Sequence, residues 1–141
     1  MAFWLIKSEP DTWSWAQQVK RGGQGEPWSG VRNHQAKLNL MRMAVGDECF
    51  FYHSNEGLAV MGIASVVRAA YPDPSAESGP WVAVDVVAKE ALPQPVTMAA
   101  IKAEPRLAEM VLVKNSRLSV QPVTPGEWAL VCQMGGLARG L

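Results

Sequence analysis

The chain has 141 residues, a length that fits one domain built around one hydrophobic core. Hydrophobic residues make up 48% of it, and 13 basic side chains balance 13 acidic ones. This balance argues against a general DNA-coating protein, which needs a basic surface, but allows a protein that grips one base. Every apolar run is too short for a membrane-spanning helix, and the N-terminal one is too short for a signal peptide. A cytoplasmic protein without membrane contact is therefore expected.

The cysteine content argues against a metal site, whereas the tryptophan content favours stacking on nucleobases. Cys49 and Cys132 lie far apart among apolar neighbours, so we expect both to be reduced and buried. The chain has only two cysteines and two histidines, and they show no metal-ligand spacing. Neither a metal nor a cofactor is therefore expected. Six tryptophans against two tyrosines exceed the needs of a core this size, and stacking on nucleobases is one use for the surplus.

The first third of the chain predicts one strand followed by short helices. In chain order we expect a strand over residues 3–8, a helix over 15–20, a loop over 24–30 and a helix over 32–44. The strand ends before Pro10, because the residue that precedes a proline is held extended. Asn33 can cap the second helix, on which Ala36, Leu40 and Met43 fall on one face.

The middle of the chain has the pattern of a hairpin and a further strand. We expect strands over residues 48–53 and 59–69, a loop over 72–80 and a strand over 81–88. The turn signal around Gly57 joins the first two strands into a hairpin. In the last strand, the β-branched Val84 and Val86 share one face and Asp85 takes the other.

The last third predicts helices around a short strand. Helices are expected over residues 97–102, 105–111 and 125–134, and a strand over 118–120. Thr97 can cap the first helix, and Thr124 and Glu127 have capping-box spacing with Pro125 at the first helical position. Five or six strands with short flanking helices indicate an α+β domain over residues 1–141, with a mixed, strongly curved sheet closing towards a barrel.

Four short blocks of sequence add a more specific signal. They are residues 4–10 (WLIKSEP), 28–36 (WSGVRNHQA), 50–54 (FFYHS) and 117–122 (RLSVQP). In content, order and spacing they resemble the EVE family, which is related to the PUA barrels and includes the thymocyte nuclear proteins. The likeness runs from residue 4 to about residue 134.

The resemblance implies both a fold and a function. The fold is a PUA-like pseudo-barrel, and the function is binding of a modified base in DNA or RNA, such as methylated or oxidised cytosine. The base would be flipped into a pocket between the sheet and its helices. Bacterial members are associated with modification-dependent defence and are often fused to nucleases. We expect a single domain here, so any cleavage would need a separate nuclease partner.

The blocks and the strand spacing together give a set of candidate ligand-binding residues. They are Lys7, Ser8, Glu9, Trp28, Arg32, Asn33, Tyr52, His53, Ser54, Arg117 and Ser119. Ser8 falls on the same strand face as Trp4 and Ile6, where a hydroxyl beside aromatic surface can hydrogen-bond a base edge. Lys7 and Glu9 share the opposite face, and a solvated ion pair at a strand end is the plain alternative.

Four of the candidates suit the flat face and the phosphate of a nucleotide. Trp28 stands in a loop, where it can stack on an extruded base or plug the end of the barrel. Arg32 and Asn33 begin a helix whose free N–H groups suit a phosphate or a carboxylated base. Asn33 can also read a base with donor and acceptor together, or only cap the helix. Arg117 shares a face with Ser119 and can bind a phosphate or form an ion pair with Glu9 that holds the barrel shut.

The end of the 48–53 strand supplies the remaining candidates. Tyr52 and Ser54 share one face and offer hydroxyl groups. His53 takes the other face, and a hydrogen-bonded core histidine is the alternative there. Among the other tryptophans, packing roles are expected for Trp13, Trp15 and Trp128, whereas Trp81 can line the mouth of the pocket.

Other functions stay open from the sequence. Related barrels of the ASCH type include nucleoside amidohydrolases, and Lys7 beside Glu9 could do acid–base work of that kind. RNA is an alternative to DNA, because PUA relatives commonly bind RNA. A purely protein-binding role would predict no response to any nucleoside. The oligomeric state cannot be derived from these patterns.

Overall fold

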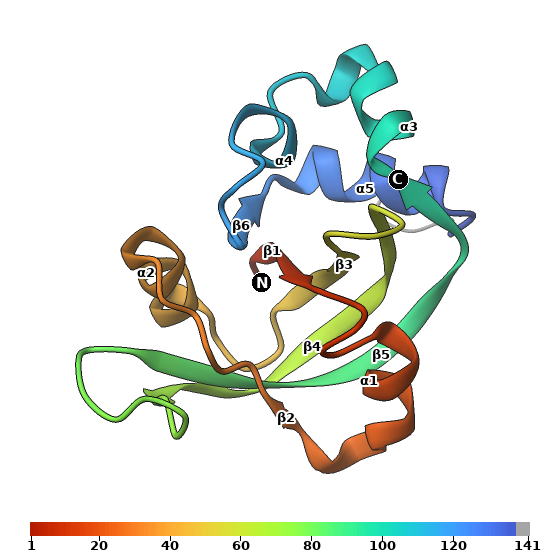
Figure 1. The fold of residues 1–141 in the computed structure, drawn as a ribbon. Coiled ribbons are helices and arrows are strands. Elements are labelled where there is room, and N and C mark those ends of the chain that lie inside the picture. The colour runs from red at the N-terminus through yellow and green to blue at the C-terminus, as the bar shows by residue number, and fades with distance from the viewer. Residues whose placement is uncertain (138–141) are drawn as a thin grey trace.

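Over residues 1–137, which the computed structural model describes, six strands pair into one mixed sheet (Figure 1). The strands are β1 (Phe3–Ser8), β2 (Glu26–Pro27), β3 (Glu48–His53), β4 (Ala59–Pro72), β5 (Val82–Thr97) and β6 (Val120–Val123). Their order across the sheet is β2-β5-β4-β3-β1-β6. β1 and β3 are parallel, and every other neighbouring pair is antiparallel. With its short helices, this sheet confirms the expected α+β class and PUA-like curvature.

The curvature comes from the two longest strands, β4 and β5. They contain 14 and 16 residues, and their pairing is interrupted by several register shifts. Each shift is a bulge-like irregularity that bends the strand and increases its twist. The sequence prediction ended the second of these strands at residue 88. The structure continues it to Thr97. Beyond Asp85 and Val86 no strand within residues 1–137 pairs with its outer edge, and an edge tolerates Pro93 and Pro95.

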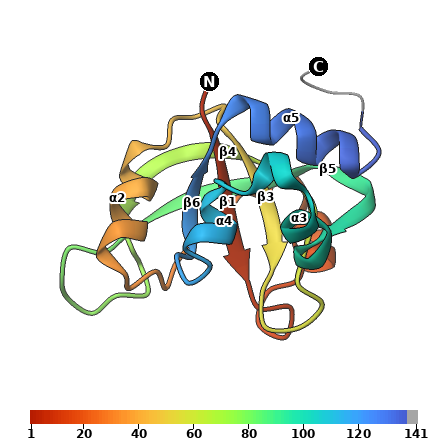
Figure 2. The same cartoon turned by 90° about the horizontal axis from the view of Figure 1, so that it is seen from above.

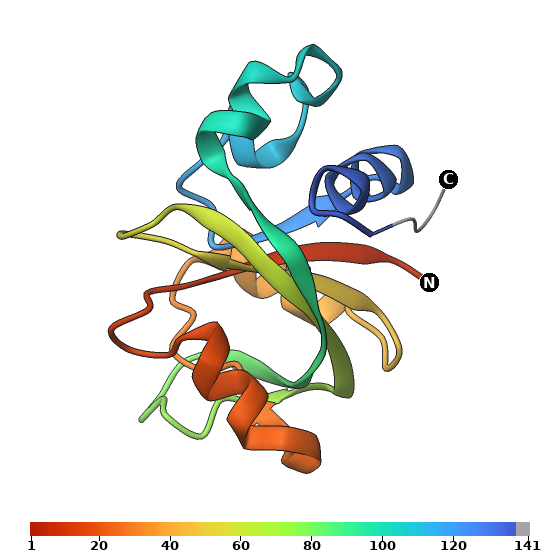
Figure 3. The ribbon, with the colours of Figure 1, turned by 90° about the vertical axis from the view of Figure 1, so that its right-hand side faces the viewer.

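Helices cover both faces of the sheet. They are α1 (Trp15–Arg21), α2 (His34–Arg42), α3 (Met98–Ala103), α4 (Val111–Lys114) and α5 (Pro125–Met134), with single 3-10 turns at Gly22–Gln24 and Pro105–Leu107. Figure 2 shows α3, α4 and α5 gathered over β1 and β3, and Figure 3 shows the sheet between these helices and α1. No helix within residues 1–137 has the length and apolarity needed to cross a membrane.

The capping predictions are confirmed and fix where the helices begin. Asn33 accepts a hydrogen bond from the N–H of Ala36 at 2.9 Å, so α2 starts at His34 rather than at residue 32. Thr124 and Glu127 form the predicted capping box at the start of α5. The expected helix over 105–111 is instead a 3-10 turn followed by α4. The last strand begins two residues later than expected and ends three residues later.

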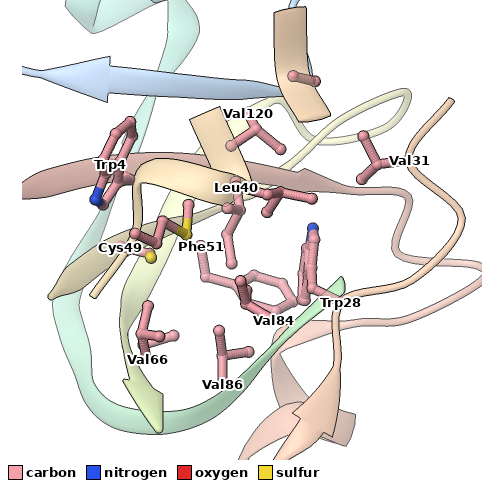
Figure 4. Packing of buried hydrophobic residues seen from close by; sticks show 14 of the residues in the cluster. Trp4, Trp28, Val31, Leu40, Cys49, Phe51, Val66, Val84, Val86 and Val120 are labelled. Atoms are coloured by element: carbon pink, nitrogen blue, oxygen red, sulfur yellow. The ribbon is translucent and has the colours of Figure 1, made fainter. Parts of the chain in front are cut away.

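Two buried clusters lie on opposite faces of the sheet. The first, inside the curve, joins Trp4, Phe51 and Val84 from the strands to Leu40 from α2 (Figure 4). The second lies under α3, α4 and α5 and contains Trp128, whose ring stacks on Phe50 with centroids 3.8 Å apart. Cys49 is buried in the first cluster and Cys132 in the second, and neither forms a disulfide, as expected.

Gly62 gives a direct test of packing against the first cluster. A Cβ at this position would lie 2.3 Å from a ring carbon of Trp15, which is only 8% exposed. Because overpacking a core costs about 1–3 kcal/mol, we expect Gly62→Ala to lower the free energy of unfolding by that amount in urea denaturation. Gly126→Ala is the matched control, since nothing lies within 4 Å of its added Cβ. An unchanged unfolding midpoint for Gly62→Ala would contradict this packing.

Candidate functional site

A cavity of about 560 Å³ opens where β1 and β2 end and α2 begins. This volume lies within the range of small-molecule sites, about 300–1,000 Å³. Four separate segments of the chain line it, so the fold alone brings them together. The lining residues are Lys7, Ser8, Glu9, Thr12, Trp13, Glu26, Pro27, Trp28, Ser29, Gly30, Val31, Arg32, Asn33 and Ser119.

The apolar side of the cavity is continuous with the first buried cluster. Trp28 and Val31 line the cavity, yet each is only 8% exposed. The Trp28 ring meets Phe51 edge to face, with centroids 5.4 Å apart and planes at 83° (Figure 4). The N–H of Trp28 also donates to the carbonyl oxygen of Val84 at 2.7 Å. Trp28 therefore belongs to the first buried cluster and lines the cavity at the same time.

Trp13 contributes a second indole, and its position is fixed by hydrogen bonds. Its Nε1–H donates to Oε1 of Gln18 at 2.9 Å. Gln18 is fully buried and donates from Nε2 to the carbonyl oxygen of Val86 at 3.3 Å. The hydroxyl of Ser8 donates to the backbone carbonyl of Trp13, which joins the end of β1 to this turn. A half-buried indole held in this way is prepared for contact with a flat ligand.

Asp73 fixes the rim of the cavity from the other side. Its Oδ2 accepts hydrogen bonds from the N–H of Gly30 at 2.8 Å and from Nη1 of Arg32 at 3.0 Å. Its Oδ1 accepts from both the N–H and the hydroxyl of Ser75 at 2.7 Å. Burial alone would raise the pKa of Asp73, but these hydrogen bonds outweigh it and lower the pKa to about 2. The carboxylate thus ties the 72–81 loop to Arg32.

The sequence and the fold of this chain both match those of known proteins. The family model described as the EVE domain matches residues 2–134. The chain belongs to the EVE family. Human thymocyte nuclear protein 1 is 32% identical to this EVE domain over 163 residues, covering 93% of this chain and 72% of the human protein.

Two solved structures show how closely the fold agrees. The solution structure of Rpa0253 from Rhodopseudomonas palustris is 61% identical with a TM-score of 0.92, covering 96% of this EVE domain and 94% of that chain. A crystal structure of human thymocyte nuclear protein 1 in complex with DNA containing 5-methylcytosine is 32% identical with a TM-score of 0.89, covering 96% of this chain and 98% of that one.

The EVE domain brings most of the predicted site residues to the cavity. Those that line it are Lys7, Ser8, Glu9, Trp28, Arg32, Asn33 and Ser119. Their direct contact with a ligand stays a prediction. The ammonium group of Lys7 donates to the carbonyl oxygen of Ser116, and partial burial lowers its pKa. Within residues 1–137, no ion pair joins Lys7 to Glu9.

The other predicted residues lie outside the cavity. Tyr52 belongs to the second buried cluster, on the opposite face of the sheet, and burial raises its pKa. His53 accepts a hydrogen bond on Nε2 from the N–H of Trp15 at 3.0 Å, which is the core role left open above. Ser54 donates its N–H to the carbonyl oxygen of Ser8. Arg117 is exposed, and no ion pair with Glu9 forms in the described part of the chain.

Sequence reasoning missed several cavity residues, most importantly Trp13. It was expected to pack, and it does touch the first cluster, but it also lines the cavity. Its position directly after the first block, on the turn that follows β1, was the available signal. Trp81 lines a different cavity, which lies beyond Arg32.

Proposed function

We propose that this EVE domain binds a modified base in nucleic acid, flipped out of its strand into the 560 Å³ cavity. The observation that carries the proposal is a cavity that combines two tryptophans with polar side chains at one end of the sheet. Human thymocyte nuclear protein 1, which shares the fold at 32% identity, has been crystallised with DNA containing 5-methylcytosine. This relative supports the proposal for the present chain.

The chemistry of the lining suits a base better than a charged or flexible ligand. A base needs apolar contact on its faces, which Trp13, Trp28 and Val31 offer, and hydrogen bonds at its edges. Glu9 and Glu26 present carboxylates of the kind that accept a hydrogen bond from the exocyclic amine of cytosine. Both carboxylates would repel an anionic ligand, so the phosphate belongs at the rim beside Arg32.

We further propose that the domain is a binding module rather than an enzyme. The amidohydrolase alternative needs an accessible Lys7 acting with Glu9, whereas the ammonium group of Lys7 already bonds the carbonyl oxygen of Ser116. Human thymocyte nuclear protein 1 has been crystallised in complex with DNA, which favours binding. The cytoplasmic location and the separate nuclease partner stay predictions from the sequence.

The proposal is tested by fluorescence polarisation across short DNA and RNA strands that each carry one modified cytosine or adenine. Selective binding of one variant, with strands intact by mass spectrometry, would support a base reader. A preference for one sugar would decide between DNA and RNA. Equal binding of modified and unmodified strands would contradict the proposal. Turnover of N4-acylated cytidine in the same buffer would instead favour the amidohydrolase.

Trp13 provides the sharpest variant for this assay. Removing an aromatic platform costs about 1–3 kcal/mol per stacked base, so Trp13→Ala should weaken binding of the preferred strand by about 5- to 150-fold. Trp13→Phe, which keeps a ring but loses the hydrogen bond to Gln18, should retain most of the affinity. Equal affinities for wild type and Trp13→Ala, with native circular dichroism, would exclude Trp13 as a contact.

A further inference from the structure

A second cavity, of about 440 Å³, lies next to the first and has not entered the proposed function. It is bounded by the C-terminal end of β4, the start of β5, residues 79–81 and the last turn of α2. Its lining residues are Met41, Ala70, Tyr71, Pro72, Gly79, Pro80, Trp81 and Val82. Aromatic and apolar groups dominate this lining, although Met41 on its edge is 54% exposed.

Arg32 connects the two cavities. It lines the first one, and its guanidinium carbon lies 5.7 Å from the ring centroid of Trp81, which lines the second. The same guanidinium is held by Asp73 and Ser75, so its position between the cavities is fixed. A cation fixed between two aromatic cavities is suited to a phosphate that links two nucleotides.

Trp81 is also held in place, and its ring has an aromatic neighbour. Its carbonyl oxygen accepts the N–H of Asp73 at 3.0 Å, which closes the 73–81 loop. Gly79, at a φ of +97°, packs so closely that an added Cβ would lie 2.9 Å from Nε1 of Trp81. The exposed ring of His34 lies 4.8 Å from the Trp81 ring, tilted by 34°. These contacts fix a flat aromatic surface at the cavity.

A second cation lies against another aromatic residue of this cavity. The guanidinium carbon of Arg68 lies 3.6 Å from the ring centroid of Tyr71, which lines the cavity and donates a hydrogen bond to Asp85. Two aromatic rings that line the second cavity thus each carry a cation, Trp81 with Arg32 and Tyr71 with Arg68. Aromatic surface beside two cations matches a base with its neighbouring phosphates.

We infer that the second cavity binds the nucleotide next to the flipped base, with its base against Trp81 and its phosphates towards Arg32 and Arg68. This inference rests on the proposed function, because it places a neighbour of the base that occupies the first cavity. It predicts that the domain reads at least two consecutive nucleotides. The affinity for a strand should then exceed the affinity for the isolated modified nucleoside.

The test compares Trp81→Ala with wild type on three ligands. These are 5-methyl-2′-deoxycytidine, a trinucleotide with 5-methylcytosine at its centre, and the same trinucleotide with one neighbouring base removed. The third ligand is made in two forms, with the abasic site either 5′ or 3′ of the modified base. The corresponding ribose ligands form a second arm that separates DNA from RNA. Val19→Ala, at an exposed position on α1, is the matched surface control. Circular dichroism confirms that each variant is folded.

Loss of one stacked base predicts that Trp81→Ala weakens trinucleotide binding by about 5- to 150-fold and leaves nucleoside binding unchanged. An abasic site on one side should weaken wild-type binding similarly and remove the effect of Trp81→Ala. Gly79→Ala, which displaces the indole of Trp81 without deleting it, should also weaken binding of the trinucleotide.

Two results would overturn the inference while leaving the proposed function standing. In the first, Trp81→Ala binds the trinucleotide as tightly as wild type does, which would mean that no base contacts this ring. The other is an equal loss for nucleoside and trinucleotide, which would mean that Trp81 only supports Arg32. If wild type binds no modified ligand in preference to its unmodified counterpart, the proposed function itself fails, together with the inference.

Discussion

Trp28→Ala is expected to lower the free energy of unfolding by about 3–5 kcal/mol, the usual cost of deleting a large buried aromatic side chain. Trp28 is 8% exposed and packs edge to face on Phe51. Because the ring is buried, this substitution tests the fold as well as the cavity. Urea denaturation followed by circular dichroism measures the loss.

Two comparisons make the Trp28 result interpretable. Trp28→Phe keeps most of the ring volume and should lose less stability than Trp28→Ala. Trp13→Ala removes a half-buried indole from the same cavity and should also lose less. A loss below about 1 kcal/mol for Trp28→Ala, outside the range for a buried aromatic, would show that the ring is not part of the core.

Asp73→Asn is expected to destabilise the protein by about 2–4 kcal/mol at neutral pH, because charge-assisted hydrogen bonds to a buried carboxylate are lost. The amide also turns a donor towards groups that themselves donate, namely Gly30, Arg32 and Ser75. The rim of the cavity should loosen, so affinity for the modified strand should fall as well. Asp11→Asn, at an exposed position, is the matched control.

The same carboxylate predicts an acid-dependent loss of stability. The pKa of Asp73 is about 2 in the folded protein, below its ordinary value of 3.8. The charged form therefore stabilises the fold by about 2 kcal/mol above pH 4, and this contribution disappears as the pH falls from about 4 to about 2. Asp73→Asn should lack this part of the pH dependence. An identical acid profile for variant and wild type would contradict the role of Asp73.

The sequence predicted the elements whose signals are local. Helix starts at Asn33 and Thr124 followed from their capping side chains, and the 48–69 hairpin followed from its turn residues. Strand β2 was missed, because its two residues, Glu26 and Pro27, are too few to show an alternating pattern. The full extent of β4 and β5 was missed for a different reason. Bulges and edge prolines depend on which strands pair, and that is a property of the whole sheet.

The candidate site could be predicted only in part for a similar reason. The family-like blocks placed Ser8, Trp28 and Arg32 near one another, and the structure brings all three to one cavity. Strand alternation could not tell which face the cavity occupies, so Tyr52 was included although it lies on the opposite face. Asp73 gains its role from a long-range contact with Arg32, which no local pattern encodes. Trp13 is held by nearby Gln18, whose own position depends on a long-range hydrogen bond to Val86.

The most direct test of modified-base binding in this cavity is an NMR titration of the six tryptophan indole N–H signals with 5-methyl-2′-deoxycytidine and with unmodified deoxycytidine. Binding in the first cavity predicts that the methylated nucleoside shifts the signals of Trp13 and Trp28 at lower concentration than the unmodified one. The signals of Trp15 and Trp128, which are buried away from the ligand, should stay in place. Equal responses to the two nucleosides, or shifts that leave Trp13 and Trp28 unchanged, would contradict modified-base binding at this site.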